Sequence, residues 1–274
     1  MKTILVPTDF SNISKNAINY AVELAKLTKS KIILFHAFYV PIVTTDVMVI
    51  PPMEEIEESN LSVLKKIEKA IYKKHGKKVI VECKCKYGFP VDEINQFAKT
   101  NKVDLIVMGM HGSGELAEKL IGSTTTSLIR KSACPVLAID RKVKFKLIKK
   151  MALACDYEAI ANTKIFDPLK EIVRLFKSHV NVINITPVDE KLPTVSKAIA
   201  GIKLEHALED VNHTFWFAKN ENVVNGINDF VREKKMDMVV MIPRKHSLLK
   251  SIFNEPETKR IAFHTKVPLL ALHE

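Results

Sequence analysis

The residues of this chain that are best suited to chemistry form a glycine-rich loop in its first half. The chain has 8 glycines in 274 residues, and four of them fall within this one loop. The spacing is Gly109-x2-Gly112-x9-Gly122 followed by Ser123, and the loop comes directly after an apolar run. Glycine lets a phosphate chain approach backbone N–H groups, because a Cβ would block that approach or forbid positive φ. The loop is therefore predicted to bind phosphate groups.

A helix is predicted to begin where the loop ends. Ser123, Thr124 and Thr125 open it, so its free N–H groups, its positive dipole end and three hydroxyls would face an anion. Taken one by one, Ser123 could instead cap its helix, and Gly112 and Gly114 could be ordinary turn residues. The spacing excludes two commoner nucleotide loops, G-x4-G-K-S/T and a G-x-G-x-x-G after the first strand.

The elements that must position this loop belong to a repeated unit. Residues 91–108 align without gaps on 224–241, and CPVLAI at 134–139 aligns on VPLLAL at 267–272, both at an offset of 133. Short apolar runs alternate with segments of helical period, which is typical of strands buried on both faces between helices. We expect strands near 3–7, 31–37, 79–85, 103–108 and 135–139, and again near 149–155, 180–186, 212–218, 237–242 and 268–272. Helices are expected at 12–28, 54–75, 90–100 and 123–131 and between the strands of the second unit.

The predicted fold class is α/β, with two tandem doubly wound, Rossmann-like domains. Each domain has a five-stranded parallel sheet with flanking helices, the first over 1–142 and the second over 143–274. Ligands of such sheets bind beyond the carboxyl ends of the strands, where the strand order reverses. The junction at 141–146 is short and charged, with no glycine or serine, so we expect the domains to pack closely.

Several motifs make the chain resemble the universal stress protein family in its tandem form, with two family domains in one polypeptide. They are ILVPTDFS at 4–11, LFHA at 34–37, GMHG at 109–112 leading to IGST at 121–124, and CPVLAI at 134–139. The resemblance covers essentially the whole chain. It implies an adenine nucleotide, ATP or AMP, lying across the strand ends.

The resemblance also implies which residues would bind that nucleotide. Pro7, Thr8 and Asp9 would line the adenine and ribose side, and Ala37 would offer backbone contacts to the base. The remaining residues would hold the ribose and the phosphates: Met108, Gly109, His111, Gly112, Gly122, Ser123, Thr124 and Thr125. His111 could be merely structural, and Asp9 could instead cap the following helix or hold a divalent metal such as Mg²⁺.

The second unit has lost the special positions of the loop. At the offset of 133, Gly109 becomes Ile242, and Gly112, Gly122 and Ser123 become Lys245, Glu255 and Pro256. A carboxylate at the helix start would repel phosphate, so this unit is not expected to bind nucleotide in the same way. Asp156 is retained after its first strand, and the basic run 243–246 either meets an anion or forms a solvated turn.

Composition narrows the classes of partner. The net charge is +11, spread evenly, with 21 basic and 15 acidic residues in 1–142 and 21 and 16 in 143–274. Such a charge suits nucleic acid, an anionic membrane surface or a polyanionic ligand, but aromatic residues make up only 7%, which disfavours single-strand nucleic-acid binding. No spanning segment or signal peptide is evident, so a cytoplasmic location without membrane insertion is expected. The apolar segment 39–53 is expected to be a lid, a packing surface or a partner or homodimer contact.

The four cysteines predict neither a disulfide framework nor a metal site.

Three hypotheses about function follow from the sequence. The favoured one is a non-catalytic, nucleotide-binding regulator with one site in the first domain and an unidentified protein partner, because no acid–base pair for phosphoryl transfer is evident. The alternatives are a slow ATPase or adenylate-forming enzyme, and a scaffold with a vestigial site. Regulation under stress enters through the family resemblance alone.

Overall fold

A computed structural model describes residues 1–40, 52–110, 122–156, 162–186, 188, 195–243 and 266–273. The first half contains β1 (Thr3–Pro7), α1 (Asn12–Thr28), β2 (Lys31–Phe38), α2 (Met53–His75), the 3-10 turn η1 (Gly76–Lys78), β3 (Val81–Tyr87), α3 (Pro90–Thr100), β4 (Leu105–Gly109), α4 (Ser123–Lys131) and β5 (Val136–Ile139). The second contains β6 (Lys150–Ala154), η2 (Thr163–Phe166), α5 (Asp167–Phe176), β7 (His179–Thr186), α6 (Val195–Leu208), β8 (His213–Lys219), α7 (Val223–Glu233), β9 (Met238–Met241) and β10 (Leu269–Ala271).

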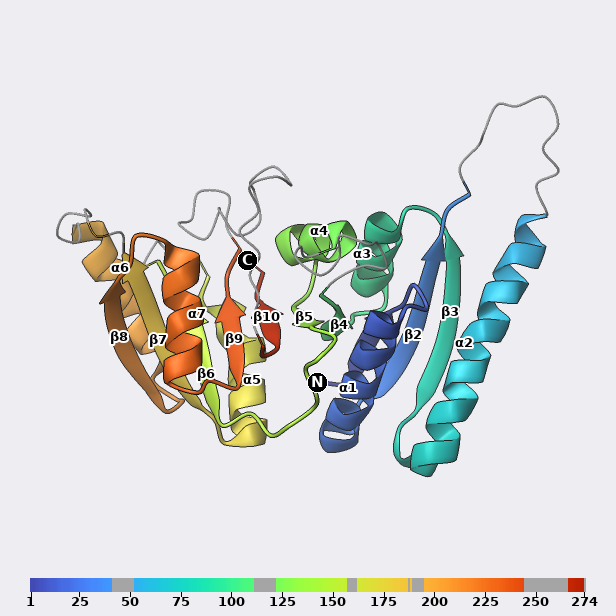
Figure 1. Ribbon diagram of the computed structural model, residues 1–274, viewed down its shortest axis with the longest axis horizontal. Helices are drawn as coiled ribbons and strands as arrows, with labels where there is room; N and C mark the ends of the chain where they lie inside the picture. The colour runs from blue at the N-terminus through green and yellow to red at the C-terminus, as the bar shows by residue number, and fades with distance from the viewer. Residues whose placement is uncertain are drawn as a thin grey trace, which may run out of the picture.

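The strands of both halves form one sheet of ten, in the order β3-β2-β1-β4-β5-β10-β9-β6-β7-β8. Within each half all neighbouring strands are parallel. The halves meet where β5 and β10 pair antiparallel, with Leu137 opposite Leu270, and these two strands lie in the middle of the molecule (Figure 1). The two predicted five-stranded sheets are thus present, and they are joined edge to edge.

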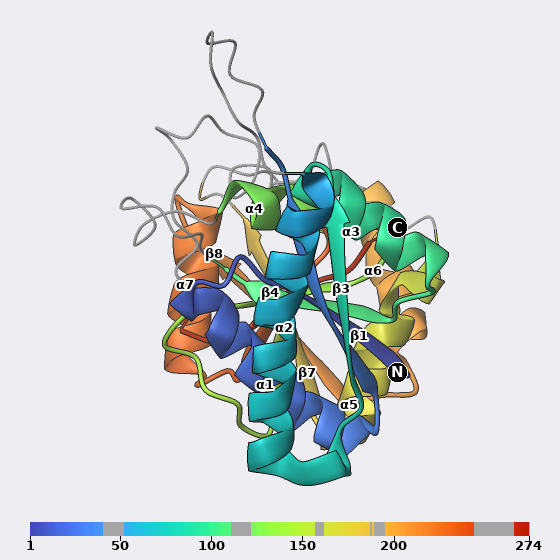
Figure 2. The ribbon, with the colours of Figure 1, turned by 90° about the vertical axis from the view of Figure 1, so that its right-hand side faces the viewer.

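Helices cover both faces of this sheet. In the first half α1 and α2 lie on one face, as the side view shows (Figure 2), and their apolar residues join a core that continues through α5 and α6 of the second half. Helices α3, α4 and α7 pack on the opposite face in a second continuous core. Every strand except the edge strands β3 and β8 buries side chains on both faces, which explains the uninterrupted apolar runs in the sequence.

The junction between the halves is packed rather than free. The ring of Phe145 lies 5.0 Å from that of Tyr20 in α1 and 6.4 Å from that of Phe176 in α5. The side-chain amide of Asn16 donates hydrogen bonds to the carbonyl oxygens of Asp140 and Val143, both at 2.9 Å. These contacts agree with the close packing expected from the short charged linker.

An aspartate at the equivalent position of each half holds the first strand of that half in place. Asp104, just before β4, accepts hydrogen bonds from the backbone N–H groups of Lys2 and Thr3 at 2.7 and 2.8 Å. Asp237, just before β9, does the same for Lys149 and Lys150 at 2.8 and 2.9 Å. The aspartate shared by the two copies of the repeat therefore fixes the amino ends of β1 and β6 against the neighbouring strand.

Parts of two predicted features lie outside the described residues. These are most of the apolar segment 39–53 and the basic run from 244 onward. At the ends of the first segment, Val40 and Met53 pack against the core of the first half. Across the described residues, none of the helices is both long and apolar enough to span a lipid bilayer.

Candidate functional site

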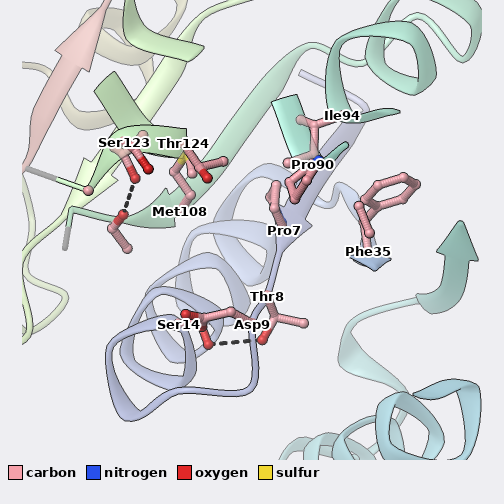
Figure 3. A pocket seen from close by; sticks show the side chains of 14 residues that line it. Pro7, Thr8, Asp9, Ser14, Phe35, Pro90, Ile94, Met108, Ser123 and Thr124 are labelled. Carbon is pink, nitrogen blue, oxygen red and sulfur yellow. Dashed lines mark hydrogen bonds between the residues drawn. The ribbon is translucent and has the colours of Figure 1, made fainter. Parts of the chain in front are cut away.

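A cavity of about 170 Å³ opens at the carboxyl edge of the first half. It lies over the ends of β1 and β4, between which the strand order reverses, the position at which doubly wound sheets bind ligands. Figure 3 shows the side chains around it, contributed by the β1 and β4 ends, by β2 and by the starts of three helices. The lining residues are Pro7, Thr8, Asp9, Ser14, Phe35, Ala37, Pro90, Ile94, Met108, Gly109, Gly122, Ser123, Thr124 and Thr125.

The turn from β1 into α1 forms one wall. Ser11 caps α1, because its side chain accepts a hydrogen bond from the backbone N–H of Ser14 at 3.2 Å. The buried Thr8 hydroxyl lies 2.9 Å from the Ser14 hydroxyl and accepts from the N–H of Phe10 at 3.0 Å. Thr8 and Ser14 therefore hold the turn in shape (Figure 3).

Asp9 is the carboxylate of this turn, and it does not cap α1. Its Oδ1 accepts a hydrogen bond from the N–H of Ser11 at 3.1 Å, while its side chain is exposed at the cavity. Partial burial raises the pKa of Asp9, but hydrogen bonds from the Ser11 side chain and backbone and from Ser14 outweigh that effect and leave its pKa below the usual 3.8. Asp9 is thus an anion and a hydrogen-bond acceptor at neutral pH.

The side of the cavity formed by β2 and α3 is apolar. Phe35 and Ala37 are two residues apart on β2 and so share one face of the sheet. Pro90 and Ile94 lie one turn apart at the start of α3. Phe35 is fully buried and its ring lies 4.9 Å from that of Phe97, so this wall is held rigid by the core beneath it.

The opposite side of the cavity is the start of α4. Gly122 stands at the N-cap position and has no side chain to cap the helix, and the first N–H groups of a helix have no partner within the helix itself. Ser123 is exposed and Thr124 half-buried at the cavity. Ser123 is the first residue of the helix rather than its cap, which removes the alternative left open by the sequence.

Gly109 and Thr125 have structural roles that the sequence did not predict, whereas the backbone angles of Gly122 do not require glycine. A Cβ on Gly109 would lie 2.7 Å from Cγ2 and 3.3 Å from the backbone carbonyl carbon of Ile13, so the close approach of α1 already requires glycine there. Gly122 has φ −56° and ψ 146°, which other residues also adopt. The hydroxyl of Thr125 donates to the carbonyl oxygen of Gly109 at 2.8 Å and ties α4 to β4, so it is not free to donate to a phosphate.

Ten of the twelve predicted site residues line this one cavity. The other two, His111 and Gly112, lie outside the described residues. Sequence reasoning missed Ser14, Phe35, Pro90 and Ile94. The alternation of side chains along β2 could have identified Phe35, which lies two residues before Ala37 on the same face. The predicted start of α3 at the same sheet edge could have identified Pro90 and Ile94.

The corresponding place in the second half holds a cavity of only about 10 Å³, about the minimum that one water molecule needs. Strand registers identify the equivalent residues, because Pro7 pairs with Phe35 as Ala154 pairs with Ile183. Ile185 therefore stands where Ala37 stands in the first half. Asp156 is retained but buried; that the chain has one nucleotide site stays a prediction.

The described lining of the first-half cavity carries few groups that could exchange a proton. Among its described lining residues Asp9 is the one titratable side chain, so they supply no acid–base pair. Across the described residues no group of three or more histidine, cysteine or acidic side chains could hold a metal ion. What the lining offers is a flat apolar wall, a carboxylate and an uncapped helix start.

Comparison with known proteins agrees with this architecture. The universal stress protein family model matches residues 1–140. A universal stress protein of Methanocaldococcus jannaschii is 33% identical over 149 residues, covering 52% of this chain and 84% of its own, and universal stress protein YxiE of Bacillus subtilis is 34% identical over 143 residues, covering 50% and 97%. The crystal structure of a universal stress protein from Archaeoglobus fulgidus matches 99% of this chain and 96% of its own with a TM-score of 0.70 at 17% identity, which shows that the two-half fold is shared. The chain belongs to the universal stress protein family.

Proposed function

We propose that the chain is a regulatory protein that binds one adenine nucleotide, ATP or AMP, in the cavity of its first half. The observation that carries the proposal is the set of chemical groups that meet at that cavity. One side is an apolar wall at Phe35, Ala37, Pro90 and Ile94, a second carries the Asp9 carboxylate, and a third is the start of α4 (Figure 3).

These groups match the parts of a nucleotide. The apolar wall suits the flat face of a base, and an ionised carboxylate accepts hydrogen bonds from ribose hydroxyls, as in other doubly wound nucleotide sites. The uncapped N–H groups of a helix start, together with its dipole, favour phosphate. Ser123 and Thr124 add two hydroxyl donors at the same end.

The second half supports the proposal as an internal comparison. Its sheet has the same strand order and the same aspartate after the first strand, yet its cavity is nearly filled. We infer that occupancy of the first site alone alters a contact with a protein partner. Mg²⁺ would enter with ATP, with Asp9 as the described carboxylate able to face it.

Copying the filled site into the open one tests this proposal. Ala37→Ile introduces the side chain present at Ile185, and we expect it to weaken ATP and AMP binding at least roughly 100-fold in calorimetry, since the branched side chain occupies the base position. Ala218→Ile, at an exposed strand position of the second half, is the matched control and should leave binding unchanged. Unaltered affinity in Ala37→Ile would refute the assignment of the base side.

A second variant tests the phosphate side. Ser123→Glu places a carboxylate at the start of α4, where it competes for the helix N–H groups and repels phosphate. We expect ATP affinity to fall more than adenosine affinity. Phosphate release measured on the wild type distinguishes the enzyme alternative, because turnover that Ser123→Glu abolishes would show ATP hydrolysis at this site.

A further inference from the structure

Five exposed lysines gather at the end of the first half that is opposite the cavity. Lys29 follows α1, Lys73 and Lys74 are in the last turn of α2, and Lys77 and Lys78 are in η1. We call this set the lysine corner. It lies at the amino ends of the strands, below the sheet in Figure 1, and none of its members takes part in an ion pair with another described residue.

The surroundings confirm that positive charge accumulates there. Two acidic side chains near the corner are already paired with other residues: Glu23 with Lys26 at 2.8 Å, lying 3.8 Å from His75, and Glu82 with Lys31 at 3.1 Å. Burial lowers the pKa of His75, and Lys26, Lys74 and Lys78 lower it further against the opposing effect of Glu23. A lysine in the last turn also offsets the helix dipole, which accounts for Lys73 and Lys74 but not for the lysines beyond the helix ends.

Two exposed aliphatic side chains accompany the lysines. Leu27, in the last turn of α1, is 45% exposed, and Ile80, between η1 and β3, is 64% exposed. The exposed aromatic residues Tyr39, Tyr87 and Phe89 lie instead at the other end of β2 and β3, away from the corner. Aliphatic groups among lysines suit a lipid interface, whereas single-stranded nucleic acid requires aromatic stacking partners.

The charges of helix α2 are divided between its two ends, with the positive end at the lysine corner. Its first turns carry the exposed acidic residues Glu54, Glu55, Glu57 and Glu58, and its last turns carry the lysines. An anionic surface would attract one end of the helix and repel the other. Contact through the corner would leave the cavity, at the opposite edge, open to ligand.

We propose that the lysine corner docks this protein on the surface of an anionic lipid membrane. The lysines contact lipid phosphates, and Leu27 and Ile80 enter the boundary between headgroups and acyl chains. The contact is peripheral and reversible, and it is independent of the nucleotide site.

Vesicle sedimentation tests the proposal, with phosphatidylglycerol-containing and pure phosphatidylcholine vesicles as probes. We expect salt-sensitive binding to the anionic vesicles alone. The variant Lys74→Gln, Lys77→Gln, Lys78→Gln should reduce the partition coefficient roughly 10- to 100-fold. The matched control Lys164→Gln, Lys203→Gln, Lys219→Gln removes the same charge from exposed positions of the second half and should change it less than about threefold.

Leu27→Ser with Ile80→Ser should also weaken vesicle binding, without altering its salt dependence. Calorimetry with ATP on both corner variants should give the wild-type affinity, which separates failure of this proposal from failure of the nucleotide site. Equal binding to both vesicle types, no binding to the anionic ones, or an equal loss in the control variant would overturn the proposal. Binding to single-stranded RNA or to an acidic peptide without vesicle binding would overturn it too, and would assign the corner to that partner.

Discussion

The two halves of this protein share a strand order and a core but differ at the carboxyl edge of the sheet. In the first half that edge holds a cavity of about 170 Å³, and in the second the equivalent cavity measures about 10 Å³. Ala37 and Gly109 in one half correspond to Ile185 and Ile242 in the other. The fold therefore provides the place for a site, and a few side-chain volumes decide whether the place is open.

The retained aspartate shows the same principle for polar groups. Asp9 is exposed at the open cavity, whereas Asp156 is buried beside the filled one. An aspartate at this position can serve a ligand only where the neighbouring walls leave room. Its presence in the sequence is therefore not evidence of a second nucleotide site.

The largest expected effect is a loss of stability, caused by a substitution that removes a side chain from the filled site of the second half. Ile242 is 6% exposed and belongs to the core. Ile242→Gly should lower the free energy of unfolding by about 4 kcal/mol, through the lost side chain, the cavity and the freer backbone of glycine. Urea unfolding measures this cost, and Ile242→Val should cost about 1 kcal/mol. Nucleotide binding gained by the second half in Ile242→Gly would contradict the view that several side chains close it.

Most of the fold could be predicted from the sequence because its pattern is local. Helices at 12–28, 90–100 and 123–131 have the predicted bounds, set by helical period and by turn residues at their ends. The strand expected at 79–85 is observed at Val81–Tyr87, because the apolar pair before it, Val79 and Ile80, belongs to the connection. The β5–β10 pairing was not predicted, since an edge strand that meets another edge has the same apolar run as a buried one.

The site could be predicted less completely, and for a physical reason. Motif residues mark the ends of β1 and β4. Phe35, Pro90 and Ile94, in contrast, contribute shape rather than polar groups, and the sequence does not distinguish an apolar residue that lines a cavity from one that lies in the core. Contact with Ile13, distant in the sequence, gives Gly109 a second reason to be glycine, and its predicted role toward phosphate stays a prediction. The division of the chain at residue 142 stays a prediction.

An intermediate loss of stability tests the aspartate that both halves share before β4 and β9. Asp104→Asn and Asp237→Asn should each lower stability by about 2 kcal/mol at pH 7, because each replaces a charged acceptor of two backbone hydrogen bonds. Burial raises the pKa of Asp237, but Lys146 and the N–H groups of Lys150 and Lys149 lower it below 3.8 overall.

The Asp237 contribution is therefore complete above its ordinary pKa of about 3.8 and is lost as pH falls through the lowered value. Urea unfolding of wild type and Asp237→Asn should differ at pH 7 and converge in strong acid. A difference that persists in strong acid would contradict this role for the carboxylate.

The smallest effect separates the roles of two adjacent threonines in the open half. Thr125→Val removes the hydrogen bond to Gly109 and should cost about 1 kcal/mol of stability, with ATP affinity falling several-fold as the start of α4 shifts. Thr124→Val, at the half-buried neighbour, should weaken ATP binding with little change in stability. Equal stability losses in both variants, by thermal unfolding, would show that the Thr125 hydrogen bond does not specifically fasten α4.

The central claim is that one half of this chain is open to an adenine nucleotide and the other is closed. Titration calorimetry of the full chain with ATP, and separately with AMP, tests it most directly through the number of sites. We predict one bound nucleotide per chain, competed by the other nucleotide and lost in Ala37→Ile. Two equivalent sites per chain, or heat of binding that survives in Ala37→Ile, would contradict the claim.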